Sequence, residues 1–179
     1  MTSPEPVDSG ERPFPPVHAG DERTLLTAML EWYREGVRLK VAGLPQELAT
    51  ASPLHSGTTV AGLVKHLALV EDDWSRRIAE RPEVEPWAGA PWDDDRDWEF
   101  HSAVDEPLVD TLALYDAACA RTRRSTQALA LDHTVTDDRG KTFSLRFVLL
   151  HLIEETARHA GHLDIARELL DGHTGLGPR

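Results

Sequence analysis

Apolar residues recur at helical spacing in four long segments, and this periodicity constrains the fold more than any other feature of the sequence. The predicted helices span about residues 21–43, 58–81, 106–131 and 144–171. Asp21 and Thr58 or Thr59 are suitable N-caps for the first two, and Gly172 is a suitable end for the last. Four long amphipathic helices without a strong strand predict an all-α protein, a four-helix bundle with one long connection.

The connections between the helices carry weaker patterns. Residues 81–107 (RPEVEPWAGAPWDDDRDWEFHSAVDEP) have no sustained period but contain three tryptophans, which predict an ordered loop. We expect Trp92 or Trp98 either to form a wall of a cavity or to attach the loop to the helices. Residues 133–145 (HTVTDDRGKTFSL) alternate around an Asp-Arg-Gly turn, which indicates a short hairpin or an irregular connection.

Length and composition restrict the class of protein. The 179 residues fit one domain, expected at 21–172, with a proline-rich flexible arm at 1–20 and a tail at 173–179. A net charge of −12 argues against nucleic acid or an anionic membrane as the main partner, and no apolar run is long enough to span a bilayer. The single cysteine, Cys119, is expected to be a small buried residue, and a cytoplasmic location follows as the expectation.

The last predicted helix contains the stretch IEETARHAGHLDIARE (153–168), with polar groups beside its apolar stripe. At about 100° per residue, His159 lies about 40° from Glu155, and His162 lies about 20° from it in the other direction. His151 lies about 40° away on the same side as His162, whereas core positions such as Leu152 begin at about 60°. The polar cluster therefore occupies the edge of the buried stripe.

Glu155 and His159 are four residues apart, so both can bind one ion. A mixed nitrogen and oxygen set suits zinc, with nickel, iron or manganese as alternatives. A third ligand is expected from a facing helix, and His66 lies at the matching edge of the stripe in 58–81. In the competing interpretation each histidine is a satisfied boundary residue and Glu155 a solvated partner of His159. Asp73 is either a pocket residue or a solvated acid.

The segments TVAGLVKHLALVE and LIEETARHAGHLDIARE resemble the DinB/YfiT-like superfamily of metal-dependent transferases, and the likeness extends over about residues 22–172. The resemblance implies a four-helix bundle, often dimeric, with a divalent metal held by one residue of the second helix and two of the last. Carried over by position, the metal ligands are His66, Glu155 and His159, as in the His–Glu–His branch of mycothiol-dependent maleylpyruvate isomerases. His162 is the predicted catalytic residue, as a proton relay or substrate contact, with His151 as the alternative.

The implied reaction transfers a low-molecular-weight thiol, such as mycothiol or bacillithiol, to a small electrophile. A divalent ion stabilises a thiolate at neutral pH, so no protein cysteine is needed. The alternatives are a non-enzymatic metal-binding module of a stress response and a metal-assisted hydrolase or isomerase at the same site. Trp32 and Tyr33 are adjacent and cannot both lie at the centre of one intramolecular stripe, which together with the resemblance predicts a homodimer.

Overall fold

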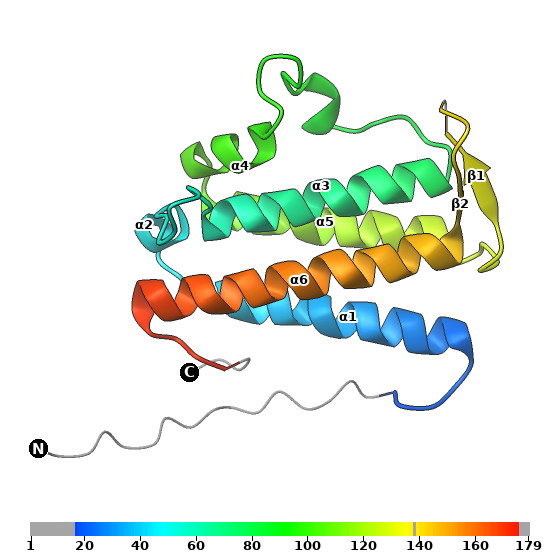
Figure 1. The fold of residues 1–179 in the computed structure, drawn as a ribbon, viewed down its shortest axis with the longest axis horizontal. Coiled ribbons are helices and arrows are strands. Elements are labelled where there is room, and N and C mark those ends of the chain that lie inside the picture. The colour runs from blue at the N-terminus through cyan, green and yellow to red at the C-terminus, as the bar shows by residue number, and fades with distance from the viewer. Residues whose placement is uncertain (1–16, 138, 176–179) are drawn as a thin grey trace, which may run out of the picture.

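The computed structural model describes residues 17–137 and 139–175, and most of them are helical (Figure 1). The long helices are α1 (Glu22–Val41), α3 (Val60–Ile78), α5 (Leu108–Thr126) and α6 (Leu145–Asp171). Two short helices, α2 (Gln46–Ala49) and α4 (Trp98–Ser102), and two 3-10 turns, η1 (Trp87–Gly89) and η2 (Ala103–Asp105), lie in the connections. The all-α class is confirmed. Most of the predicted arm and part of the predicted tail lie outside the described residues.

The helix ends follow the expected capping chemistry. The side chains of Asp21, Thr59 and Ser144 accept hydrogen bonds from backbone N–H groups three residues later, so each satisfies a donor that the first turn leaves unpaired. Gly172 ends α6 with a positive φ of 73°, a conformation that glycine adopts without steric cost. The predicted starts of α1, α3 and α6 and the predicted end of α6 are confirmed.

Two expectations about the connections require correction. The third long helix ends at Thr126 and not near residue 131, because the backbone carbonyl of Leu131 accepts a hydrogen bond from Arg146 at the start of α6. Leu129 and Leu131 reach the core from this turn instead of from a helix. The connection between the first two long helices, for which the helical pattern predicts no regular structure, contains the short helix α2. The predicted hairpin forms, with β1 (Thr134–Thr136) antiparallel to β2 (Thr142–Ser144).

The four long helices lie side by side in pairs (Figure 1). Helices α1 and α6 run in the same direction, as do α3 and α5, and α3 packs antiparallel to α6. The chain returns from the end of α3 along the outside of that helix, and this return segment contains η1 and α4. The hairpin lies at the end of the molecule where α3 finishes and α6 begins. None of the helices that the structure describes is long and apolar enough to cross a membrane.

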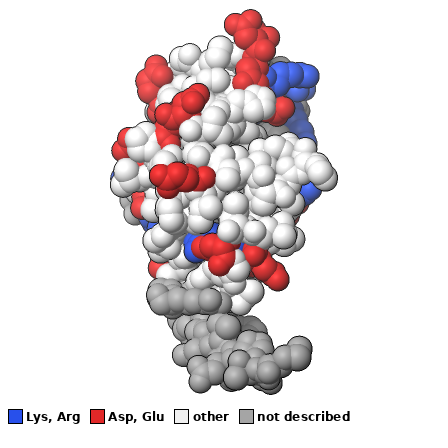
Figure 2. Space-filling view, turned by 90° about the vertical axis from the view of Figure 1, so that its left-hand side faces the viewer, with Lys and Arg blue, Asp and Glu red and all other residues white. Residues whose placement is uncertain are grey.

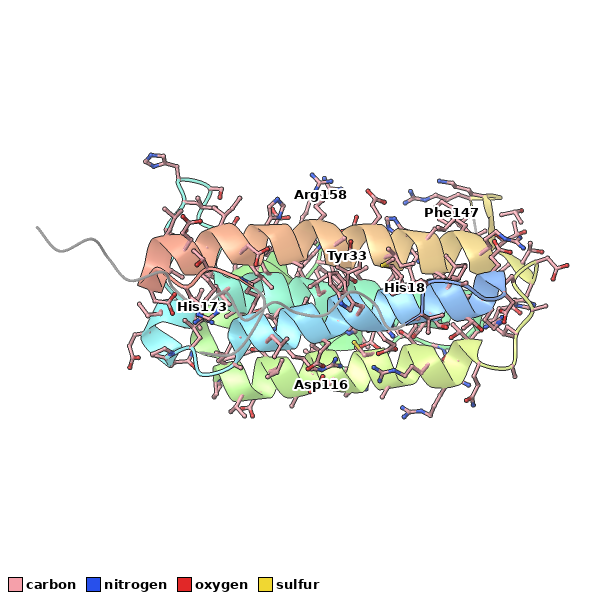
Figure 3. The ribbon with its side chains drawn as sticks, turned by 90° about the horizontal axis from the view of Figure 1, so that it is seen from below. His18, Tyr33, Asp116, Phe147, Arg158 and His173 are labelled. Carbon is pink, nitrogen blue, oxygen red and sulfur yellow. The ribbon has the colours of Figure 1, made fainter. Side chains whose placement is uncertain are left out.

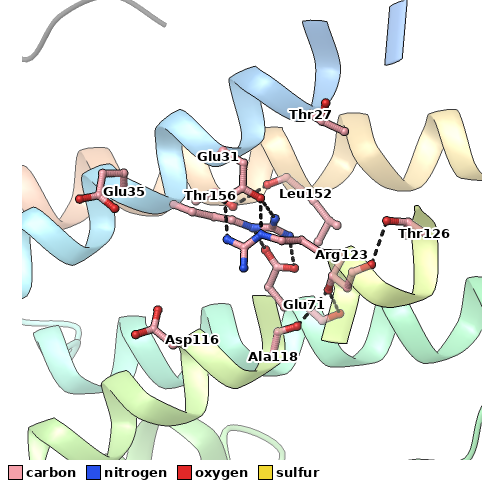
Figure 4. A network of polar contacts seen from close by, with 12 residues as sticks. Thr27, Glu31, Glu35, Glu71, Asp116, Ala118, Arg123, Thr126, Leu152 and Thr156 are labelled. Atoms are coloured by element: carbon pink, nitrogen blue, oxygen red, sulfur yellow. Dashed lines mark hydrogen bonds and ion pairs between the residues drawn. The ribbon is translucent and has the colours of Figure 1, made fainter. Parts of the chain in front are cut away.

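A buried ion pair joins α1 to α3 close to the main core (Figure 4). The guanidinium of Arg34 donates to both carboxylate oxygens of Glu71 at 2.7 and 2.5 Å, and both side chains are almost fully buried. Glu31 extends the network to Arg123 at the surface. Cys119 lies beside this pair with no exposed surface, as expected, and burial raises the pKa of its thiol to about 12. Cys119 is therefore a core residue and a thiol at neutral pH.

Candidate metal centre

The structure brings His66, Glu155 and His159 together. His66 lies in the middle of α3, while Glu155 and His159 lie one turn apart in the middle of α6. The Nε2 atom of His159 is 3.3 Å from Oε2 of Glu155, and Nε2 of His66 is 4.0 Å from the same oxygen. One donor atom of each residue lies within 4.8 Å of the others. The side chains are 21%, 18% and 12% exposed in chain order, so the cluster lies at the edge of the core and within reach of solvent.

A buried carboxylate fixes the orientation of His66. The Nδ1 atom of His66 lies 2.9 Å from Oε1 of Glu99, a residue of α4 that is 5% exposed. The other oxygen of Glu99 is buried and has no hydrogen-bond partner. When Nδ1 donates to Glu99, Nε2 is left with its lone pair directed toward Glu155. This carboxylate–histidine arrangement is the usual support of a metal-binding imidazole.

An aromatic ring covers the same histidine. The ring of Phe100 stacks on His66 with centroids 4.8 Å apart and planes 22° apart. Gly62, one turn before His66 on α3, permits this approach. A Cβ atom on Gly62 would lie 3.1 Å from Cδ1 of Phe100 and 3.3 Å from its backbone oxygen. A larger residue at position 62 would therefore require Phe100 to shift by a few tenths of an ångström.

His159 and His162 contact each other through their Nδ1 atoms, which are 3.2 Å apart. His162 is exposed, and its ring lies on the outer side of His159, edge-on at 5.2 Å. Burial, reinforced by the nearby His66, lowers the pKa of His159 to about 4, although Glu155 opposes the shift. His159 is therefore neutral at pH 7, which is the form of imidazole that binds a metal.

His151 approaches Glu155 from the other side. Its Nε2 atom is 4.0 Å from Oε1 of Glu155, and its Nδ1 atom is 3.1 Å from Oε2 of the exposed Glu154. These three residues form a second group with converging donor atoms, which shares Glu155 with the first. Asp73, considered as a pocket residue from the sequence, forms ion pairs with Arg76 and Arg77 on its own helix.

The tryptophans attach the return segment to α3. Trp98 packs edge-on against Trp87 and Trp92, and Nζ of Lys65 lies 4.1 Å above the ring of Trp98. The indole N–H of Trp87 donates to Asp72, and that of Trp92 donates to the carbonyl of Trp87. Of the two expectations for Trp92 and Trp98, attachment of the loop is the one these contacts match.

Glu99 and Phe100 are site residues that the sequence did not single out. They follow Trp98 in the stretch PWDDDRDWEF, where Glu99 is one of several acids and no helical period orients any of them. The local signal was limited to the tryptophans, which indicated an ordered segment and not the direction of its side chains.

Comparison with known proteins identifies the fold and the family. A solved structure of a conserved protein from Enterococcus faecalis is similar in fold, with a TM-score of 0.67 and 16% sequence identity, over 87% of this chain and 100% of that one. No curated protein matches the chain. A family model described as mycothiol-S-transferase matches residues 25–172, which include every residue of the candidate centre. The chain therefore belongs to the mycothiol-S-transferase family, one of the DinB/YfiT-like families.

Proposed function

We propose that the protein is a divalent-metal-dependent S-transferase that joins a low-molecular-weight thiol, of the mycothiol or bacillithiol type, to a small electrophile. The observation that carries the proposal is the convergence of Nε2 of His66, Oε2 of Glu155 and Nε2 of His159 in a member of this family. The proposal includes the family's four-helix bundle as the arrangement of α1, α3, α5 and α6.

The donor set fits a catalytic divalent ion. Two imidazoles and one carboxylate are a common set for zinc, and nickel, iron or manganese suit the same atoms. Three protein ligands leave a coordination position for a substrate. The support of His66 by Glu99 and the neutral state of His159 both favour metal binding. When bound, the ion supplies electrostatic stabilisation of a thiolate at neutral pH, a charge that the buried Cys119 does not provide.

The protein side chains position the reactants and exchange the proton. The sulfur of the small thiol forms a bond to the electrophilic carbon, and the leaving group departs with its electron pair. His162 is the proposed catalytic residue. When His159 binds the ion through Nε2, its Nδ1–H donates to Nδ1 of His162, so the exposed Nε2 of His162 carries a proton that it can donate to a bound reactant, while the thiol proton passes to solvent. His151, beside Glu155, is the proposed contact for the second reactant. Phe100 covers the opposite side of His66 and limits the access of water there.

The position of His162 favours catalysis over a purely structural metal site. A closed site needs a fourth protein ligand, and His162, which contacts His159, is the histidine to consider for that role. Its Nδ1 instead contacts Nδ1 of His159, on the far side of that ring from Glu155. Two alternatives remain: a non-enzymatic metal-binding module, and a metal-assisted hydrolase or isomerase. An activity measurement separates both from the S-transferase.

The test is to load the protein with zinc and incubate it with mycothiol, bacillithiol or glutathione and 1-chloro-2,4-dinitrobenzene. We expect faster conjugate formation with one sugar-linked thiol, loss of that activity in His159→Ala and with chelator, and full activity in Cys119→Ala. Mass spectrometry identifies the conjugate. A rate no higher than that of zinc in buffer with every thiol would contradict the proposal.

We also propose that the protein is a homodimer. Trp32 and Tyr33 pack edge-on at 5.0 Å, and both remain only partly buried within one chain. Multi-angle light scattering at micromolar concentration is expected to give twice the 19.9 kDa chain mass. A monomeric mass would contradict this proposal and leave the metal centre unaffected, because all three proposed ligands come from one chain.

A further inference from the structure

A groove of about 400 Å3 lies between the end of α3, the hairpin and the start of α6. His151 forms its inner wall and also lies 4.0 Å from Oε1 of Glu155, so the groove begins one side chain away from the candidate metal centre. Figure 3 shows Phe147, another wall residue, projecting from α6 on the same side of the molecule as Arg158, away from Asp116 of α5.

Four rings form the apolar part of the groove. Trp74 lies edge-on to Phe143, Phe147 and His151, with centroid distances of 5.2, 5.7 and 5.0 Å. Phe147 and His151 are nearly parallel, with planes 9° apart. Offset and edge-on rings of this kind hold each other in place. Lys141 lies over the ring of Phe143 and Arg77 over that of Trp74, and Phe147 keeps the most exposed apolar surface among the rings, at 43%. The walls therefore suit a small molecule with a planar apolar group.

The rim of the groove carries positive charge. Arg77, Arg139 and Lys141 line it together with two acids, Asp73 and Asp137. Asp73 pairs with Arg77, whereas Asp137 accepts from the backbone N–H groups of Arg139 and Lys141 and keeps its negative charge, so the three basic residues exceed the two acids by one. Within 17–137 and 139–175, no ion pair joins Arg139 or Lys141 to an acid. Arg139 and Lys141 thus line the groove without an ion-pair partner among the described residues, and Nζ of Lys141 lies 5.1 Å above the ring of Phe143.

This charge contrasts with the rest of the molecule. The chain has a net charge of −12, and Figure 2 shows carboxylates scattered over the end opposite the hairpin, with few basic groups in view. A second hollow of about 400 Å3 adjoins the groove and shares Arg77, Arg139 and Asp137 with it. It adds two arginines, Arg76 and Arg81, and one acid, Glu80, so basic residues outnumber acids there as well. A local excess of cations in an acidic protein favours an anionic ligand.

We propose that this groove binds the electrophile of the transfer, and that it selects small electrophiles with a planar apolar group and a carboxylate. The inference rests on the proposed function, because the groove is linked to the proposed metal ligands through His151 and Glu155. The rings hold the apolar group, Arg139 and Lys141 bind the carboxylate, and the electrophilic carbon lies beside His151. For a benzylic chloride, the carbon–sulfur bond forms as the carbon–chlorine bond breaks and chloride leaves with its electron pair.

The first experiment measures binding without reaction. The probes are 4-methylbenzoate and its uncharged match 4-methylbenzamide, titrated calorimetrically into the full chain with chelator and again with zinc. We expect the benzoate to bind about five-fold more tightly in both states, the range of an exposed charge pair. The preference is expected to disappear when Arg139→Gln and Lys141→Gln are combined, and to persist in Arg124→Gln, an exposed arginine of α5 outside the groove.

Equal binding of the two probes to the parent protein, or a preference that survives the double substitution, would overturn the inference. A preference seen only with zinc and lost in His159→Ala would show that the carboxylate binds the ion, and would overturn the inference as well.

The second experiment uses 4-(chloromethyl)benzoate and 4-(chloromethyl)benzamide with the active thiol. We expect the double substitution to raise KM for the benzoate about five-fold and to leave kcat unchanged. Intact carboxylate binding without turnover of either chloride would contradict the S-transferase proposal and leave the carboxylate subsite supported.

Discussion

Glu99→Gln separates metal binding from folding more sharply than the other single substitutions. Glu99 accepts from Nδ1 of His66 at 2.9 Å, and its carboxylate is 5% exposed, so solvent screens its charge weakly. Loss of such a partner lowers metal affinity about 10–100-fold, which is about 1.4–2.8 kcal/mol at 1.4 kcal/mol per factor of ten. Glutamine can keep the hydrogen bond and loses only the charge, so we expect about 10-fold for Glu99→Gln and about 100-fold for Glu99→Ala.

The metal-free protein is expected to respond differently. The second oxygen of Glu99 is buried without a partner, and an unpaired buried polar group is unfavourable to folding. We therefore expect Glu99→Gln to unfold in urea and chelator within about 1 kcal/mol of the parent protein. Zinc affinity is measured by competition with a chromophoric chelator, and Glu168→Gln, an exposed residue of α6, is the matched control. Zinc affinity of Glu99→Gln within two-fold of the parent would refute the supporting role of Glu99.

Three further predictions test the ligands and the core. Glu155→Ala is expected to weaken zinc binding with little change in metal-free stability. Leu152 is fully buried, so Leu152→Ala is expected to cost about 2–5 kcal/mol of stability and to keep the zinc affinity. The opposite pattern in chelator titrations and urea melts would contradict both roles. The lowered pKa of His159, about 4 against an ordinary 6.5, means that the unfolded chain binds a proton there first. The free energy of unfolding of the metal-free protein should therefore decrease as pH falls from 6.5 to 4, and the decrease should be smaller in His159→Gln. Equal pH profiles for the parent and His159→Gln would argue against this role of His159. Glu71→Ala removes the two-point partner of the buried Arg34, which keeps only the more exposed Glu31, and is expected to cost about 3 kcal/mol in urea melts. A loss below about 1 kcal/mol would mean that Glu31 or water compensates the guanidinium.

The long helices were predictable because each carries its own signal. An apolar stripe with a suitable cap fixes where a helix starts and which face it buries, and the side chains of Asp21, Thr59 and Ser144 do cap their helices. The end of α5 was not predictable from its own residues. It depends on Leu131 pairing with Arg146, a contact with a segment 15 residues later in the chain.

The positions of the candidate ligands were likewise predictable from helical geometry. Helical geometry places Glu155 and His159 at one edge of their stripe and His66 at the edge of another, and the packing of α3 on α6 brings these edges together. The angular positions alone did not distinguish His159 from His162. The structure does, because the ring of His159 points inward and that of His162 lies outside it.

The helical periodicity of the sequence could not predict how the return segment contributes to the site. Glu99 and Phe100 reach His66 because the tryptophans attach the segment and Gly62 leaves room for it. The contacts of Glu99 and Phe100 with His66 join residues more than 30 positions apart, and no periodic pattern encodes them.

X-ray absorption at the zinc edge of the loaded protein tests the metal centre most directly. The account predicts one zinc per chain, nitrogen and oxygen ligands at about 2.0–2.2 Å, scattering from two imidazoles, and no sulfur ligand in the absence of added thiol. It also predicts that one imidazole contribution is lost in His66→Ala and one in His159→Ala. A sulfur shell at about 2.3 Å in the thiol-free protein, or a spectrum unchanged by both substitutions, would place the ion elsewhere and contradict the central claim.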